Sequence, residues 1–339
     1  MAIFLGRWYN QRHIAKLIPE ENAMPELKYA DRIITDAIPL APEDKKNGDA
    51  DPETVQDQVK HTHIMNVDAT RVEDFFWVDA HWLWSGGSDK KVELPHTHDF
   101  DEVLGFVGSK REDPWDLGGE ITIWLDDEKH VLTRSCLIYI PAGTRHCPIQ
   151  FNRVDTPILF VSISPTDVYG RSAVGDAAVT TSPKEGDKPR CTIIDHTKEK
   201  FSVAGDPSKV EGPNTIPRDP SLRSTRLLHL EDDMARGAFY VDFVWLWEGN
   251  GGAPAPPHEH GWPEMIAFAG VDPEHPHDLG CTMTIVMDGD TYEMKKSSIV
   301  CIPAKVDHCP WKFHNIVKPT IVFTAGPSAM YSGSHKKGW

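Results

Sequence analysis

Short, mostly apolar segments separated by polar turn residues occupy two stretches of the chain. They cover residues 121–125, 136–140 and 157–163 in the first stretch and residues 281–287, 298–302 and 320–324 in the second. Each segment is rich in β-branched or aromatic residues, which is typical of β-strands. No long apolar pattern with a period of 3.6 residues interrupts them. The pattern therefore predicts an all-β fold of the sandwich or barrel type.

The two stretches are copies of one unit. Residues 76–79 (FWVD) match residues 239–242 (FYVD) at an offset of 163. From residue 96 onward the offset is 162, and it holds for roughly sixty residues without a gap. Fainter matches join Thr62 to Thr225 and Ile33-Ile34 to Ile193-Ile194. An internal duplication of this length predicts two tandem domains, each able to bury its own core.

Changes in composition give the expected boundaries. Residues 166–225 are rich in Pro, Gly, Ser, Asp and Lys, as expected of a connection that runs over the surface. We expect an N-terminal extension over 1–60, a first domain over 61–165, a linker over 166–225, a second domain over 226–327 and a tail over 328–339.

Charge and cysteine content limit the possible partners. The formal charge of −16 argues against binding to nucleic acid or to an anionic membrane surface. No apolar run reaches the roughly 18 residues that span a bilayer. The N-terminal apolar run is too short for a secretion signal. The six scattered cysteines predict free thiols in a reducing, cytoplasmic setting.

Three histidines and one glutamate recur in both units at matching spacing. They are His96, His98, Glu102 and His146 in the first unit and His258, His260, Glu264 and His308 in the second. Residues two apart on a strand face the same side, so each His-x-His pair can offer two imidazoles to one point. The glutamate has the same parity, and the last histidine must come from another strand. Imidazole and carboxylate together suit a first-row divalent metal ion.

A lone His-x-His is a weak signal, and the chain contains one. His61 and His63 have no glutamate partner, and the corresponding residues of the second unit are Ser224 and Arg226. We interpret this pair as a surface pair.

The pattern His-x-His-x3-Glu followed by Pro-x-Gly-x2-His resembles the two motifs of the cupin superfamily, and its duplication resembles a bicupin. The resemblance implies two tandem double-stranded β-helix (jelly-roll) barrels. It makes the eight residues above the ligands of one divalent metal ion per domain. Fe(II) is the first expectation, and Mn(II), Ni(II), Co(II), Cu(II) and Zn(II) are alternatives. Because cupins commonly dimerise, the resemblance also implies a homodimer.

The chain departs from the cupin pattern in three places. The motif glycine is Gly143 in the first unit but Lys305 in the second. If this position needs a positive φ, the lysine costs on the order of 1 kcal/mol. The motif asparagine is replaced by Gln150 and Lys312. The connection between the two motifs is long, and we expect it to be an extended hairpin, with a lid or a contact to the other domain as the alternative.

Strand alternation predicts which residues line each site. Leu104 and Phe106 should face the metal with Glu102, and Ile266 and Phe268 with Glu264. We expect the tryptophans of residues 82–84 and 245–247 to contribute to this lining. Such a cavity suits a hydrophobic or aromatic molecule, although an ordinary barrel core would look the same.

Three functions fit these residues. The first is an oxidoreductase similar to quercetin-type dioxygenases, acting on a small aromatic or enolic substrate. There Glu102 or Glu264 is the base, and Gln150 or Lys312 orients the substrate or stabilises an oxyanion. The second is a metal-dependent isomerase, lyase or decarboxylase, for which Lys312 is a candidate cation in the second unit and the first unit offers no matching inward Arg or Lys. The third is a binding or storage protein that its metal stabilises. The dioxygenase is the leading expectation.

Overall fold

The computed structural model describes residues 27–38, 58–126, 128–168, 170, 172–173, 191–197, 201–203, 206–211, 221–252, 257–329 and 334–335. Within these residues the chain is almost entirely β, and the 3₁₀ helix η1 (Ala30–Arg32) is the single helical element. No helix in this part of the chain is long and apolar enough to cross a membrane.

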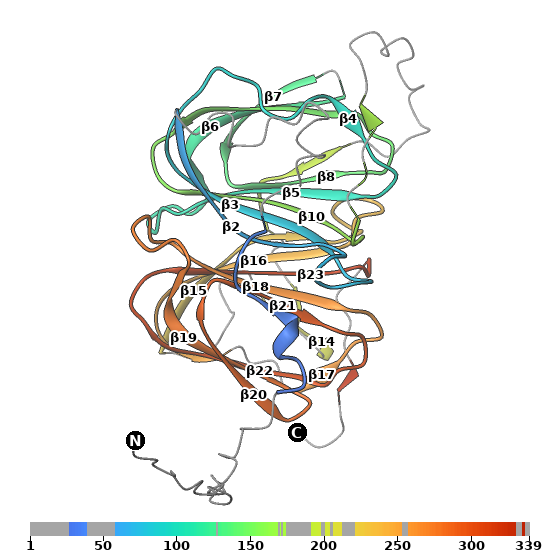
Figure 1. The fold of residues 1–339 in the computed structure, drawn as a ribbon, viewed down its shortest axis with the longest axis vertical. Helices are drawn as coiled ribbons and strands as arrows, with labels where there is room; N and C mark the ends of the chain where they lie inside the picture. Colours follow the sequence, from blue (N-terminus) through green and yellow to red (C-terminus); the bar gives the residue numbers. More distant parts are fainter. Residues whose placement is uncertain are drawn as a thin grey trace, which may run out of the picture.

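Two eleven-stranded sheets each curl into a barrel, and Figure 1 shows the two barrels stacked along the long axis. The first barrel contains β2 (Val59–Val67), β3 (Trp77–Gly86), β4 (His96–Thr97), β5 (Glu102–Gly108), β6 (Asp116–Leu125), β7 (Glu128–Arg134), β8 (Cys136–Ile140), β9 (His146–Val154), β10 (Ile158–Ser164), β11 (Ser172–Ala173) and β12 (Thr192–Ile194). The second contains β1 (Ile33–Ile34), β15 (Leu222–Leu230), β16 (Tyr240–Gly252), β17 (His258–Glu259), β18 (Glu264–Gly270), β19 (Asp278–Met287), β20 (Asp290–Lys296), β21 (Ser298–Ile302), β22 (His308–Ile316), β23 (Thr320–Gly326) and β24 (Ser334–His335). A separate hairpin joins β13 (Phe201–Val203) to β14 (Asp206–Glu211).

Strand pairing repeats between the barrels. In the first, β10 lies between β3 and β5, and β9 pairs with β4 and β6. In the second, β23 lies between β16 and β18, and β22 pairs with β17 and β19. All of these pairs are antiparallel. The predicted all-β fold of two tandem jelly-roll barrels is thereby confirmed.

Each barrel also takes an edge strand from the segment that precedes the other unit. Strand β1 pairs with β21 of the second barrel, with Ile34 opposite Ile299. Strand β12 pairs with β8 of the first barrel, with Ile194 opposite Leu137. This reciprocal exchange gives the faint isoleucine repeat a structural cause. Strands β11 and β24, which lie in the expected linker and tail, likewise extend the sheets.

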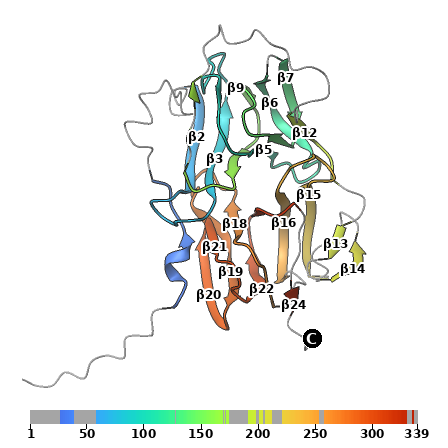
Figure 2. The same ribbon diagram turned by 90° about the vertical axis from the view of Figure 1, so that its right-hand side faces the viewer.

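A hydrophobic core shared by both halves lies where the barrels meet. It includes Trp82 and Trp84 of β3 and Trp245 and Trp247 of β16. The rings of Trp82 and Trp245 are 6.5 Å apart, centre to centre. The prediction that these indoles line the metal sites is wrong, because their face of each strand is the one covered by the other barrel. Figure 2 shows β3 and β16 in neighbouring barrels.

Two further cores fill the barrels separately. The interior of the first includes Leu104 and Phe106, and the interior of the second includes Ile266 and Phe268. These four residues alternate with residues of the shared core along β5 and β18. Their predicted inward direction is therefore confirmed.

The motif-glycine position requires a left-handed backbone in both barrels. Gly143 has φ +74° and Lys305 has φ +66°. The Gly143 amide donates to the carbonyl of His98 at 2.7 Å, and the Lys305 amide donates to that of His260 at 2.7 Å. This turn therefore holds the second histidine of each His-x-His pair in place.

Candidate metal centres

Two strands bring the first and last histidines of each set together. His96 on β4 lies directly opposite His146 on β9, and His258 on β17 lies directly opposite His308 on β22. Directly opposed residues of an antiparallel pair share a face, so their imidazoles meet inside the barrel. The ring centres are 4.3 Å apart in the first barrel and 4.4 Å apart in the second.

Backbone carbonyls orient the imidazoles of the first barrel. Nδ1 lies 2.7 Å from the Leu94 carbonyl in His96, 2.6 Å from the Phe100 carbonyl in His98 and 3.0 Å from the Thr144 carbonyl in His146. A carbonyl only accepts, so each Nδ1 carries a proton, and Nε2 is the ring nitrogen left to bind a metal ion. This arrangement is how proteins prepare histidine to bind a metal.

Glu102 lies beside two of these nitrogens. Its Oε2 is 3.3 Å from His98 Nε2 and 3.2 Å from His146 Nε2. The Ser162 hydroxyl, on β10, donates to Oε1 at 2.5 Å. The three imidazoles alone each offer a nitrogen within 4.8 Å of the others.

The second barrel gathers its four groups more tightly. One ligand atom from each of His258, His260, Glu264 and His308 lies within 4.8 Å of every other. Oε2 of Glu264 is 2.8 Å from His308 Nε2 and 3.3 Å from His260 Nε2. The Nδ1 atom of His308 faces the Val306 carbonyl at 2.9 Å, as in the first barrel. All eight predicted ligands are buried.

The protonation states of His96 and of the two glutamates fit metal binding. Burial, aided by His146, lowers the pKa of His96 to about 4, so this imidazole is neutral at pH 7. Burial alone would raise the pKa of Glu102, but hydrogen bonding to His146 and His98 holds it well below its ordinary value. The same balance lowers the pKa of Glu264. An ionised carboxylate and imidazoles with oriented nitrogens form a donor set for a divalent first-row ion.

An aromatic ring covers the same histidine in each barrel. Phe100 stacks on His98 with ring centres 4.2 Å apart, and Trp262 stacks on His260 at 4.0 Å. These stacking partners were missed in the sequence, although both stand two residues after the second histidine.

Gln150 and Lys312, expected to act on substrate, lie outside the ligand clusters. Lys312 is exposed, and its neighbours on β22 pack into the core of the second barrel. Gln150 is half-buried between Ile149 and Phe151, which pack into the first core. The pairing with β6 and β19 shifts register just after each last histidine. A one-residue shift turns the following side chains to the other face, which the simple alternation did not include.

Other polar residues occupy the barrel interiors. In the first barrel they include His63, Asp79 and His81, on β2 and β3, and Ser162. In the second they include Arg226, His229, Tyr240, Asp242 and Thr324. Asp79 and His81 share a face with Leu83 of the first core, and Asp242 shares one with Val244 of the second. In the sequence, the alternation of polar with apolar residues along β3 and β10 was the signal that could have indicated these interior polar residues.

The long connection between the motifs contacts the neighbouring barrel. Trp115 packs against the shared core, and Arg111 pairs with Glu248 of β16 at 2.6 Å. Ser135 fixes the connection by donating to the Pro114 carbonyl at 2.7 Å. Of the two alternatives to a plain hairpin, the contact to the other domain is therefore present.

The architecture and the arrangement of the candidate ligands agree with the expected bicupin pattern: two tandem jelly-roll barrels, each with a group of residues that could hold a metal ion. A scan against family models and a search of curated proteins each gave no match. Similar solved structures include a mutant of Bacillus subtilis oxalate decarboxylase, at 13% identity and TM-score 0.49, covering 81% of this chain and 74% of that one. The same enzyme solved at pH 4.6 matches at 12% identity and TM-score 0.48, with the same coverage. At this level of likeness, neither the identity nor the TM-score bears on what this chain does.

Proposed function

We propose that the chain is a metal-dependent enzyme that carries out a non-oxidative reaction on a small organic acid, as an isomerase, lyase or decarboxylase. The observation that carries the metal centres is the convergence, in each barrel, of three buried imidazoles and one buried carboxylate. Four protein ligands leave one or two positions open on a five- or six-coordinate ion. Open positions suit a catalytic rather than a purely structural site.

The barrel interiors favour acid–base chemistry on a charged substrate. The indoles that suggested an aromatic substrate lie between the barrels. Instead, ionisable side chains stand on the strands beside the ligands, and Arg226 gives the second barrel a buried cation. This cation lies in the second barrel, so the objection that the first unit lacks one still applies to the first barrel.

The residues of this chain have definable roles in such a reaction. A bound divalent ion supplies Lewis-acid polarisation of a substrate oxygen. Glu102 and Glu264 are ionised, and each can accept a proton from a substrate held beside it. The Ser162 hydroxyl orients the Glu102 carboxylate from the side away from the imidazoles. The apolar residues of the two cores exclude water from the same interior.

Oxygen dependence tests the proposal. Protein reloaded with Fe(II), Mn(II), Co(II) or Zn(II) would be assayed against a panel of small carboxylic acids, with and without oxygen. We expect turnover that is unchanged under strict anaerobiosis and lost in Glu102→Gln and Glu264→Gln. Ser162→Ala should reduce turnover less than Glu102→Gln does. Absence of turnover for every acid and metal would contradict the proposal.

The second candidate is the dioxygenase-type oxidoreductase that the sequence favoured. It rests on the same open coordination positions and on the phenylalanines of each core. Oxygen uptake that matches substrate consumption would support it and reject the first. The identity of the metal, the homodimer and the cytoplasmic location stay predictions.

A further inference from the structure

A third group of metal-binding side chains lies inside the first barrel, separate from the two centres above. It consists of His63 on β2 and Asp79 and His81 on β3. His63 and His81 are directly opposed across the two strands, and Asp79 stands two residues from His81 on the same face. Two neighbouring strands therefore place two imidazoles and one carboxylate together.

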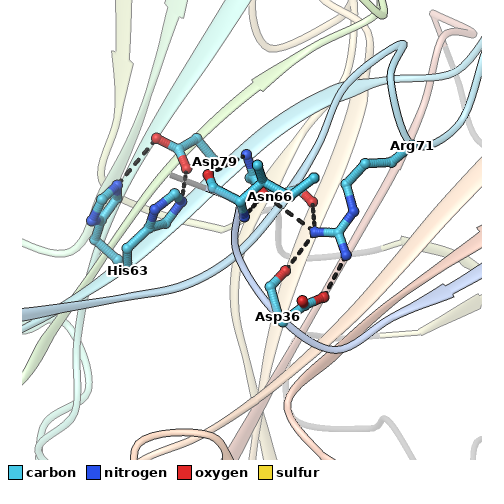
Figure 3. A network of polar contacts seen from close by, with 7 residues as sticks. Asp36, His63, Asn66, Arg71 and Asp79 are labelled. Carbon is cyan, nitrogen blue, oxygen red and sulfur yellow. Dashed lines mark hydrogen bonds and ion pairs between the residues drawn. The ribbon is translucent and has the colours of Figure 1, made fainter. Parts of the chain in front are cut away.

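The three side chains already point toward one another. Nε2 of His81 lies 3.1 Å from Asp79 Oδ2, and Nε2 of His63 pairs with the other carboxylate oxygen. The two imidazole rings are stacked 4.3 Å apart. One ligand atom from each residue lies within 4.8 Å of the others, so small side-chain rotations bring all three onto one ion. Figure 3 shows dashed lines from the Asp79 carboxylate to two adjacent imidazole rings.

Burial of the group is uneven in a way that permits exchange with solvent. The His81 side chain is 4% exposed, whereas those of His63 and Asp79 are 20% and 17% exposed. Burial works against ionisation of Asp79, but His81 and His63 keep its pKa below the ordinary value. An ionised carboxylate therefore stands in a largely dry setting, where a lone charge is costly.

The second barrel shows what this carboxylate position requires. The residues equivalent to His63, Asp79 and His81 are Arg226, Asp242 and Val244. Arg226 Nε donates to the Asp242 carboxylate at 2.8 Å and 3.0 Å, and Nη2 donates as well. A permanent, covalently attached cation thus neutralises the carboxylate. In the first barrel, imidazoles replace it, and imidazoles are good metal ligands.

We propose that His63, Asp79 and His81 form a third metal site, present in the first barrel and not in the second, that binds a first-row divalent cation. Two histidines and one carboxylate are a common ligand set for such ions, with water in the open positions. His61, on the same face of β2, has its ring centre 6.1 Å from that of His81 and stands where a fourth ligand could reach the ion. The bound cation takes the role that Arg226 has in the second barrel.

Metal counting with a barrel-exchange variant tests the proposal. The full chain would be stripped with chelator, reloaded with Zn(II) or Co(II), dialysed and analysed for metal per chain. We expect about three atoms in the wild type, one for each ligand group. The His63→Arg/His81→Val variant installs the second barrel's own residues and should bind about two. Asp79→Asn should also lose one atom, and circular dichroism would verify that both variants are folded.

A second pair of substitutions separates this site from the proposed function. His96→Ala/His258→Ala removes a ligand from each of the two main centres and should leave about one atom per chain. If that variant keeps all its metal, the proposed function fails while the third site stands. If the wild type binds no more metal than His63→Arg/His81→Val, the group is only a hydrogen-bonded cluster and the third site is refuted.

Discussion

The two barrels hold the same metal ligands but neutralise one inward carboxylate in different ways. Asp79 in the first barrel is flanked by His63 and His81. Asp242 in the second is held by the guanidinium of Arg226. Both carboxylates stand at the same place in the repeat, on a strand that also forms the contact between the barrels.

This difference shows that the two repeats have the same candidate metal ligands, whereas the polar residues near those ligands differ. Arginine is always charged and matches a carboxylate with two parallel donors. Histidine can be neutral, can donate to the carboxylate, or can bind a metal. The second barrel therefore has a fixed charge balance, whereas that of the first depends on what it binds.

The largest expected effect is the loss of the buried arginine. Arg226→Ala leaves Asp242 ionised, buried and without its cation, so we expect the free energy of unfolding to fall by roughly 3–5 kcal/mol. His63→Ala in chelator-treated protein removes one donor from a partly exposed group and should cost about 1–2 kcal/mol. Urea denaturation at pH 7 measures both. Equal losses in the two variants would mean that the barrels do not differ in this way.

An acid titration should show how much the Arg226–Asp242 pair stabilises the second barrel, with a smaller effect than the loss of Arg226. Burial alone would raise the pKa of Asp242, but the attraction of Arg226 outweighs it and lowers this pKa from 3.8 to about 2. A lowered carboxyl pKa contributes stability that is present above the unfolded value near 4 and is lost as pH falls through about 2. This difference corresponds to about 2 kcal/mol.

The matched control replaces the pair with apolar residues, as Arg226→Met/Asp242→Leu. Between pH 4 and pH 2, the wild type should lose about 2 kcal/mol more than this variant, because the variant has no carboxyl group to protonate there. Parallel losses of unfolding free energy in the two proteins would show that the ion pair does not set this part of the acid response.

The smallest expected effect comes from the turn after β8 and β21. Lys305→Gly removes the strain of a left-handed lysine and should stabilise the protein by up to about 1 kcal/mol. Gly143→Lys introduces that strain into the first barrel and should destabilise it by about the same amount. A Cβ at Gly143 meets nothing within 4 Å, so the backbone alone sets this cost. Thermal melting would compare the two variants with the wild type. A Gly143→Lys variant more stable than the wild type would contradict the explanation from backbone strain.

The fold and the ligand residues followed from local patterns and from the repeat. Strand segments, the His-x-His pairs and the final histidines all lie at one offset, and one geometric rule places their side chains on one face. The positive φ at residue 305 was also predictable, because the equivalent residue of the first unit is Gly143.

The rest depended on contacts between distant parts of the chain. The direction of Trp82 could not be known without the second barrel, which covers its face of β3. Lys312 faces outward because of a register shift that alternation alone does not reveal. His63 looked like half of a weak motif because its partners, Asp79 and His81, come from the next strand. Pairing between strands, rather than spacing along one strand, forms that group.

Anomalous diffraction from crystals of the metal-loaded protein tests the central claim most directly. The account predicts one strong peak in each barrel, about 2.0–2.2 Å from three histidine Nε2 atoms and one glutamate oxygen. These are His96, His98, His146 and Glu102 in the first barrel and His258, His260, His308 and Glu264 in the second. Crystals of fully loaded protein with no peak at either position would contradict it.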